Sequence, residues 1–295
     1  MKWLWLIAGI MGLFNPAFPV EKFNTSSKFQ KHFQYFSRKE VNQFLETLQR
    51  EGVQFEDRIR VIATARLGTP FEWQAIGEGS GIEPAPIFRI DRTNCTAFIL
   101  TTMALASAQS FHQAESLMTY LNYYPLPAGQ NPVSYHNRIH FTSDRLLTSP
   151  YFEIITNAIA EPTMLDTARV ILNRQEDGTH FLPLDWEKEV ELAYIPRTHI
   201  TPALLQRLPA VCGVAVVQKE LFKNGIIIGH EGILLDGKDF IHSSKYTRRV
   251  VREDFYRYTR KRKKYVLTPV CDGIVLYQMK PVTPVHSLSV QPQKP

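Results

Sequence analysis

Residues 94–108 read NCTAFILTTMALASA. From Cys95 onward it is rich in Ala, Leu, Met and Thr and contains no Gly or Pro, which predicts a buried helix. Thr93 or Asn94 is the expected cap, so Cys95 lies in the first turn. A helix N-terminus favours negative charge and lowers the pKa of a thiol placed there. The stretch therefore predicts a core helix that begins with a candidate nucleophile.

Helices are also predicted on either side of this stretch. Ser37 followed by Glu40 is a capping-box pattern, and apolar residues at helical spacing then predict a helix over 38–51 that ends at Gly52. Two further helices are expected over about 55–67 and 112–123.

The second half of the chain is β-rich from about Glu189 onward. Two apolar runs, 211–218 and 226–235, are joined by a turn at Gly225 and predict a hairpin. Another turn leads into a strand at 240–243, and two more strands follow. Helices first and an antiparallel sheet afterwards indicate an α+β fold.

The N-terminus has the pattern of a secretory signal peptide, with Lys2, an apolar stretch over 3–14 and a break at 15–19 that contains two prolines. We predict that residues 1–20 are removed on export and that the mature protein is periplasmic or secreted. No later run approaches the ~20 apolar residues that a membrane span requires.

The rest of the chain is long enough for one well-packed domain, with 44% hydrophobic and 21% charged residues. We predict a single catalytic domain over 21–280, with an insertion over about 125–208 built from short helices and strands. The Pro-rich segment 281–295 is predicted to be a flexible tail.

The formal net charge is +6, and much of the excess lies in the segment 257–264, where basic residues alternate with tyrosines. Such a composition is compatible with nucleic acid, but export argues against that partner. Two interpretations stay open, a weak contact with anionic envelope surfaces and a solvated basic face.

Three cysteines are few, and their odd number leaves at least one free, for which Cys95 is the candidate. Cys212 and Cys271 each lie in a short β-type run. They either form a disulfide in an oxidising compartment or serve as two small buried hydrophobic residues.

Two histidines can complete a catalytic group with Cys95. His230 and His242 lie on consecutive predicted strands, so they can be neighbours across the turn. In cysteine hydrolases an imidazole takes the thiol proton and a further polar group orients that imidazole. Taken singly, a cysteine that starts a helix and a histidine in a strand are more often structural.

No metal or other cofactor is predicted. His136 and His140 are four residues apart and can share a helix face, but no third ligand stands at a suitable spacing.

Five short motifs occur in order along the chain: LGTPFEW at 67–73, NCTAF at 94–98, RIHFTSD at 138–144, GHEGI at 229–233 and FIHSS at 240–244. In this order they resemble the NlpC-like papain-fold cell-wall hydrolases, most closely the N-acetylmuramoyl-L-alanine amidase-like branch. The resemblance implies a papain-like core with Cys95 as nucleophile, His230 as general base and His242 as the orienting residue. It also implies that the backbone N–H of Cys95 is an oxyanion donor.

The chain departs from the family pattern at three places beside this triad. Asn94 stands where an aspartate usually precedes the cysteine, Cys212 and Gly213 replace a Gly-Asp pair, and Glu231 replaces the hydrophobic residue that usually follows the histidine. These departures bear on substrate preference more than on the existence of the site.

Four further residues are candidates for substrate binding. Arg138 and His140 are expected to face the cleft and hold a substrate carboxylate, or else to form a loop packed by its own polar contacts. Phe71 and Trp73 either wall the cleft or cap a helix end against the core.

The expected function is that of an exported peptidoglycan hydrolase that cleaves an amide bond of muropeptides through an acyl-enzyme. The bond between muramic acid and L-Ala is favoured, because the long insertion resembles the amidase-like branch. The alternatives are a stem-peptide endopeptidase or an acyltransferase on the same fold, and a non-catalytic wall-binding module.

Overall fold

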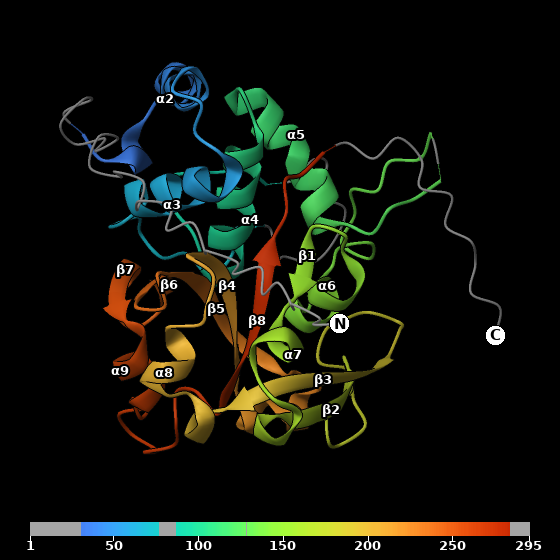
Figure 1. Cartoon of the computed structure of the whole chain (residues 1–295). Coiled ribbons are helices and arrows are strands. Elements are labelled where there is room, and N and C mark those ends of the chain that lie inside the picture. The colour runs from blue at the N-terminus through green and yellow to red at the C-terminus, as the bar shows by residue number, and fades with distance from the viewer. Residues whose placement is uncertain (1–30, 77–86, 128, 284–295) are drawn as a thin grey trace, which may run out of the picture.

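The computed structural model describes residues 31–76, 87–127 and 129–283. Over these residues the chain has an α+β architecture, in which a layer of helices lies above a large antiparallel sheet (Figure 1). The α+β prediction is confirmed. The predicted signal peptide at 1–20 lies outside the described residues. Within them, no helix combines the length and the apolar character needed to cross a membrane.

The helical layer matches the predicted helices within two residues at every end. The capping box at Ser37 is present, because the Glu40 N–H donates to Ser37 Oγ at 3.3 Å and the Ser37 N–H donates to Glu40 Oε2 at 2.7 Å. The elements are the 3-10 turn η2 (Phe33–Tyr35) and the helices α2 (Arg38–Arg50), α3 (Phe55–Ala65), α4 (Cys95–Ser107) and α5 (Phe111–Asn122).

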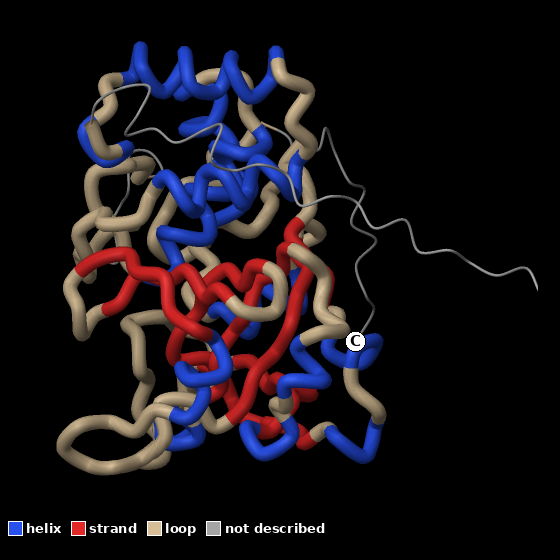
Figure 2. The backbone as a smooth tube through the Cα atoms, turned by 60° about the vertical axis from the view of Figure 1, so that its left-hand side comes forward, coloured by secondary structure: helices blue, strands red, loops and turns tan. Residues whose placement is uncertain are grey.

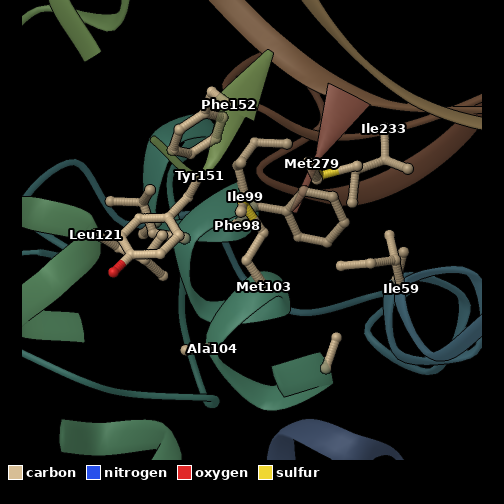
Figure 3. Packing of buried hydrophobic residues seen from close by; sticks show 14 of the residues in the cluster. Ile59, Phe98, Ile99, Met103, Ala104, Leu121, Tyr151, Phe152, Ile233 and Met279 are labelled. Atoms are coloured by element: carbon tan, nitrogen blue, oxygen red, sulfur yellow. The ribbon is translucent and has the colours of Figure 1, made fainter. Parts of the chain in front are cut away.

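Helix α4 is the buried centre of this layer. Its residues from 97 to 106 are all buried, so it is apolar on every side and not only along one stripe. Figure 3 shows Phe98, Ile99 and Met103 packed among Leu121, Tyr151, Phe152, Ile233 and Met279. Full burial of one such side chain contributes roughly 1.5–3 kcal/mol. Because the helix is held from all sides, its first residue has a fixed position above the sheet.

The sheet has eight strands in the order β2-β3-β8-β4-β5-β6-β7, with β1 paired to β8, and each of these strand pairs is antiparallel. The strands are β1 (Phe152–Ile154), β2 (Asp166–Leu172), β3 (Lys188–Pro196), β4 (Val211–Val217), β5 (Ile228–Leu235), β6 (Asp239–Ser244), β7 (Arg249–Asp254) and β8 (Gly273–Met279). The predicted hairpin is confirmed as β4 and β5.

Both faces of the sheet centre are covered, which explains why β4 is apolar throughout. Alternate residues such as Val211 and Ala215 join the core below α4, whereas Val214 and Val216 join a second core on the opposite face. Figure 2 shows the strands between the long helices above and short helical turns below. Short helices of the lower part are α7 (Thr156–Ile159), α8 (Pro202–Leu205) and α9 (Phe255–Arg260).

The segment predicted as an insertion over 125–208 is continuous with the main fold. Strand β3 pairs with β8 through Ile195 and Ile274, and β2 pairs with β3, so the segment extends the central sheet. The segment and the turn after it add α6 (Thr142–Thr148) and three 3-10 turns, η3 (Pro162–Met164), η4 (Arg197–His199) and η5 (Lys219–Asn224).

Cys212 and Cys271 lie in the second core, and both are free and fully buried. Burial raises the pKa of each thiol to about 12. The disulfide alternative is therefore wrong, and the two residues act as small hydrophobic side chains.

The start of the predicted flexible tail is packed. Val282 is buried and its N–H donates to Ser107 Oγ at 2.9 Å, while the carbonyl of Thr283 accepts from Tyr151 Oη at 2.8 Å. These contacts fasten the chain past the end of β8 to the end of α4. The rest of the predicted tail, 284–295, lies outside the described residues.

Candidate active site

Cys95 is the first residue of α4, as predicted, and it is partly exposed. Asn94 caps the helix, because its Oδ1 accepts the N–H of Ala97 at 2.7 Å. Its Nδ2 donates to the carbonyl of Trp73 at 2.8 Å, which ties the cap to the preceding loop. An aspartate at this position has no such N–H to donate. Asn94 thus caps the helix without adding a negative charge beside the thiol.

A pocket of about 280 Å³ brings Cys95 and His230 together. One side is formed by the start of α4 and the other by the first residues of β5. The remaining lining residues include Thr96, Tyr135, His140, Thr142, Phe181 and Glu231. The pocket therefore combines a thiol at a helix start with an imidazole on a strand, the two groups that acyl transfer by cysteine requires.

His242 lies directly behind His230. Nε2 of His230 and Nδ1 of His242 are 2.9 Å apart, a hydrogen-bond distance, and their rings are nearly perpendicular at 87°. The ring of His242 stacks on Phe240, and Tyr258 packs against both histidines. These aromatic residues bury the pair and hold both rings in one orientation. The sequence prediction that the two histidines are neighbours is confirmed.

A β-bulge sets the direction of His230. The β4–β5 register passes from Val216 opposite His230 to Val217 opposite Ile228, which leaves Gly229 as the extra residue. Such bulges re-aim side chains near functional sites. A Cβ at Gly229 would come within 2.2 Å of the Gln218 side chain, and one at Gly232 within 2.8 Å of the His242 Cβ. Both glycines are therefore needed for this packing.

The pKa of the thiol is the reverse of what the helix start predicts. Burial, followed by the negative charge of Glu231, raises the pKa of the Cys95 thiol to about 11, although backbone hydrogen bonds from Glu231 and Thr96 offset part of the rise. Burial also holds the pKa of His230 well below 6.5 and lowers that of His242. At neutral pH a neutral thiol and a neutral imidazole thus line the same pocket.

Glu253 on β7 lies beyond His242. Its Oε1 is 3.7 Å from His242 Nε2, and its Oε2 pairs with Lys261. The contact with His242 is the largest cause that lowers the pKa of Glu253 to about 2, and the carboxylate in turn raises the pKa of His242 against the effect of burial. A separation of 3.7 Å is longer than a direct hydrogen bond, so the carboxylate acts mainly through its charge.

A buried ion pair lies under the pocket. Glu231 and Arg145 are 0% and 1% exposed, and Arg145 Nη2 donates to both oxygens of Glu231 at 2.8 and 2.6 Å. The hydroxyls of Thr96 and Thr142 also donate to Oε1, at 2.8 and 3.0 Å, and that of Tyr277 to Oε2 at 3.3 Å. This network joins the start of α4 to α6, β5 and β8.

Strand alternation explains how two consecutive residues, His230 and Glu231, belong to the histidine pair and to the buried ion pair, respectively. Successive side chains of a strand point to opposite faces, so Glu231 contacts α4 while His230 packs with Phe240 and Tyr258. The sequence singled out Glu231 only as a departure from a family pattern. Nothing in the sequence linked it to Arg145, which lies 86 residues away.

Comparison with known proteins assigns the chain to a family. A family model described as AmiA-like, N-acetylmuramoyl-L-alanine amidase-like, matches residues 61–267, more than half of the chain. The chain belongs to this amidase-like family. Membership supports a hydrolase of the peptidoglycan amidase-like kind. No curated protein matches the chain.

Solved structures show the same fold at low identity. A protein of Legionella pneumophila matches with a TM-score of 0.64 at 19% identity, over 83% of this chain and 96% of that one. An N-acetylmuramoyl-L-alanine amidase of Bacteroides uniformis matches with a TM-score of 0.59 at 16% identity, over 77% of this chain and 99% of that one. At such identities the likeness concerns the fold alone.

The predicted substrate residues of this amidase-like chain are not brought together. His140 lines the pocket, and its Nε2 is 2.7 Å from the carbonyl of Tyr135. Arg138 does not line it: its side chain is 1% exposed and lies over the Tyr135 ring, 5.4 Å from the centroid. The expectation that Arg138 faces the cleft is therefore wrong for this structure, because its guanidinium turns inward onto an aromatic face.

Phe71 and Trp73 also lie outside the pocket lining. Phe71 is buried, and the guanidinium of Arg248 lies over its ring. Trp73 is 59% exposed, and its ring packs edge to face on that of Phe71 with the ring centroids 4.9 Å apart. The expectation that the two residues wall the cleft is thus wrong for this pocket. For Phe71 the alternative holds, because it is buried and packs against the core.

A second depression, of about 400 Å³, lies between the turn after β2 and η5. Gln175, Glu176, Asp177, Lys223 and Asn224 line it. It contains no thiol or imidazole, so the chemistry favours the Cys95 pocket. Among the described residues, no three His, Cys, Asp or Glu side chains are grouped as metal ligands.

Proposed function

We propose that this chain is an NlpC-type, papain-like cysteine hydrolase that cleaves the amide between N-acetylmuramic acid and L-Ala in muropeptides. One observation carries the proposal: the thiol of Cys95 at the start of α4 and the imidazole of His230, which is hydrogen-bonded to His242 behind it, line one pocket. Family membership supports the choice of substrate.

In the proposed mechanism the proton path runs through fixed tautomers. Glu253 can only accept, so its charge favours the proton on Nε2 of His242. Nδ1 of His242 then accepts the Nε2–H of His230 at 2.9 Å. This arrangement leaves Nδ1 of His230 unprotonated and available to the thiol of Cys95.

The amide is then cleaved through an acyl-enzyme. Nδ1 of His230 takes the thiol proton while Sγ of Cys95 attacks the amide carbonyl carbon, and the oxyanion that forms is stabilised by the backbone N–H at the helix start. The C–N bond breaks as protonated His230 gives its proton to the leaving amine of L-Ala. Water, deprotonated by His230, cleaves the thioester and regenerates the thiol.

Digestion of defined muropeptides followed by mass spectrometry tests the bond. The proposal expects an intact stem peptide that begins with L-Ala, together with the free sugar. Release of an L-Ala-D-Glu dipeptide would establish the endopeptidase alternative, and transfer of the acyl group to an added amine would establish an acyltransferase. If the protein binds sacculi but releases no product from muropeptides, with or without the added amine, it is a wall-binding module and not an enzyme.

We also propose that the protein acts outside the cytoplasm, after removal of residues 1–20. The motivation is the apolar stretch at 3–14 and the extracytoplasmic substrate of the family. N-terminal sequencing of the protein from a periplasmic or culture fraction tests this proposal, and an intact Met1 in the active fraction would contradict it.

Replacement of the two histidines should separate their roles. His230→Ala is expected to lower kcat by about 10³-fold, because the thiol loses the group that takes its proton. His242→Gln should keep measurable activity, since an amide oxygen can still accept the His230 N–H. Steady-state kinetics on one muropeptide give both values. The reverse order of losses would show that base and orienting residue are exchanged.

The pH profile follows from the lowered histidine pKa. Catalysis requires neutral His230, and its depressed pKa keeps it neutral as the pH falls, so the acid limb of kcat/KM should lie below 6.5. Glu253→Gln removes a charge that raises the pKa of both histidines, and should move this limb to still lower pH. It should also lower kcat by about tenfold, the rate equivalent of one pKa unit.

Glu220→Gln is the matched control, because Glu220 also pairs with a lysine, Lys263, but with no histidine of the described residues. Its acid limb should coincide with that of the parent. An unchanged profile in Glu253→Gln would show that the carboxylate has no part in the site.

A further inference from the structure

The chain forms a protruding hairpin loop directly after α9. The N–H of Val270 donates to the carbonyl of Lys261 at 3.0 Å, and that of Lys263 to the carbonyl of Thr268 at 2.8 Å. Between these bonds the loop folds back, with the Leu267 N–H donating to the Lys263 carbonyl at 3.0 Å. We call residues 261–270 the basic hairpin. In Figure 1 it lies below α9, at the end of the molecule opposite α2.

The tip of the basic hairpin consists of three consecutive apolar side chains that face solvent. Tyr265, Val266 and Leu267 are 87%, 64% and 63% exposed. Single exposed apolar residues are common on soluble proteins, but a contiguous group on a protruding turn marks an interaction site.

The backbone of the tip adds a second observation. Leu267 has a φ of +54°, a conformation in which a glycine is far less strained than a leucine. The turn favours glycine at this position, but the chain has a leucine there, and its side chain is exposed to solvent. Strained residues of this kind occur where an interaction uses them.

Four cationic residues precede the tip along the chain. Lys261 and Lys263 in the stem pair with Glu253 and Glu220, which fixes the hairpin to the body of the protein. Arg262 and Lys264 are exposed, and neither makes an ion pair within the described part of the chain. Positive charge thus lies just behind the apolar tip.

We propose that the basic hairpin is a membrane-docking element that inserts its tip into the surface of an anionic phospholipid bilayer. Val266 and Leu267 enter the boundary between headgroups and acyl chains, Tyr265 lies at the headgroup level, and Arg262 and Lys264 contact the lipid phosphates. Apolar and electrostatic contributions of this size give reversible binding, which leaves the hydrolase free to reach its substrate.

The order of charges and apolar groups favours a bilayer over other occupants. Three side chains cover far less than the roughly 800 Å² per partner that a stable protein interface buries. A wall polymer accounts for the cations but leaves the apolar tip in water. A bilayer surface satisfies both, because it presents phosphates above an apolar layer.

Vesicle sedimentation with the full chain tests the proposal. The protein is mixed with vesicles of phosphatidylglycerol and phosphatidylcholine, or of phosphatidylcholine alone, and the bound fraction is measured at low and high salt. The double variant Val266→Asp/Leu267→Asp is expected to lower the partition onto anionic vesicles by at least about tenfold. Because parent and variant both contain residues 3–14, that apolar stretch contributes equally to both.

Two further variants make the test specific. Tyr35→Asp removes another exposed aromatic residue, 65% exposed, and should bind as the parent does. In Tyr265→Trp, the emission of the new tryptophan should shift to the blue on addition of anionic vesicles. Melting curves establish that each variant is folded, which is expected because the tip contributes to no core.

The proposal is overturned if the double variant partitions like the parent, or if the Tyr265→Trp emission does not shift. It is also overturned if the double variant loses binding to purified sacculi while its vesicle binding is unchanged, since the hairpin then recognises wall polymer. Muropeptide hydrolysis in solution should be the same for parent and double variant, so the outcome is independent of the proposed function.

Discussion

Cys95→Ser is expected to lower kcat by at least about 10³-fold while the melting temperature changes by only a few degrees. A serine hydroxyl is a much weaker acid than a thiol, so neutral His230 cannot take its proton as readily. The structural cost is small because Cys95 is partly exposed and its helix is capped by Asn94. Kinetics on a muropeptide and a thermal melt give the two values.

Cys212→Ser is the matched control, since Cys212 is fully buried in the second core. A hydroxyl buried there without a partner should cost about 1–3 kcal/mol of stability and leave kcat almost unchanged. If Cys95→Ser keeps full activity, or if it is the variant that unfolds, Cys95 is a packing residue and the proposed mechanism is wrong.

Glu231→Ala is expected to destabilise the fold by about 3–5 kcal/mol, because it leaves the guanidinium of Arg145 buried without its carboxylate. Activity should fall as well, since Glu231 bonds to Thr96, the residue after the nucleophile. Arg145→Met alone should be similarly damaging. The double variant Glu231→Ala/Arg145→Met should recover part of the stability, because no unpaired charge remains.

Chemical denaturation of the four proteins gives the coupling energy. Arg169 and Glu191 provide the control pair, at 2.7 Å but 70% and 58% exposed, and Glu191→Gln should cost under about 1 kcal/mol. Equal effects at the two pairs would show that burial does not set the strength of the Glu231–Arg145 interaction.

The helical half of the fold is readable from the sequence because its signals are local. The capping box at Ser37, the Gly at 52 and the uninterrupted apolar run after Cys95 each act within a few residues. The turn at Gly225 is equally local, since its φ of +67° suits glycine. Such patterns determine the elements whatever the rest of the chain does.

The register that joins His230 to His242 also has a partly local origin. Both residues flank one short turn, so few pairings are available. The bulge at Gly229 is not visible in the sequence of either strand. It depends on Val217 of β4 and is fixed only when the sheet forms.

The α+β class, the helix that begins with Cys95 and the neighbouring histidines could be predicted from the amino-acid sequence. What lies around them depends on the tertiary structure: the pairing of Glu231 with Arg145, the carboxylate of Glu253 behind His242, and the inward turn of Arg138. The tertiary structure also reversed the expected direction of the thiol pKa. The physical reason is that burial and charge pairing sum over residues far apart in the chain, whereas helix caps, turns and strand alternation are set by neighbours.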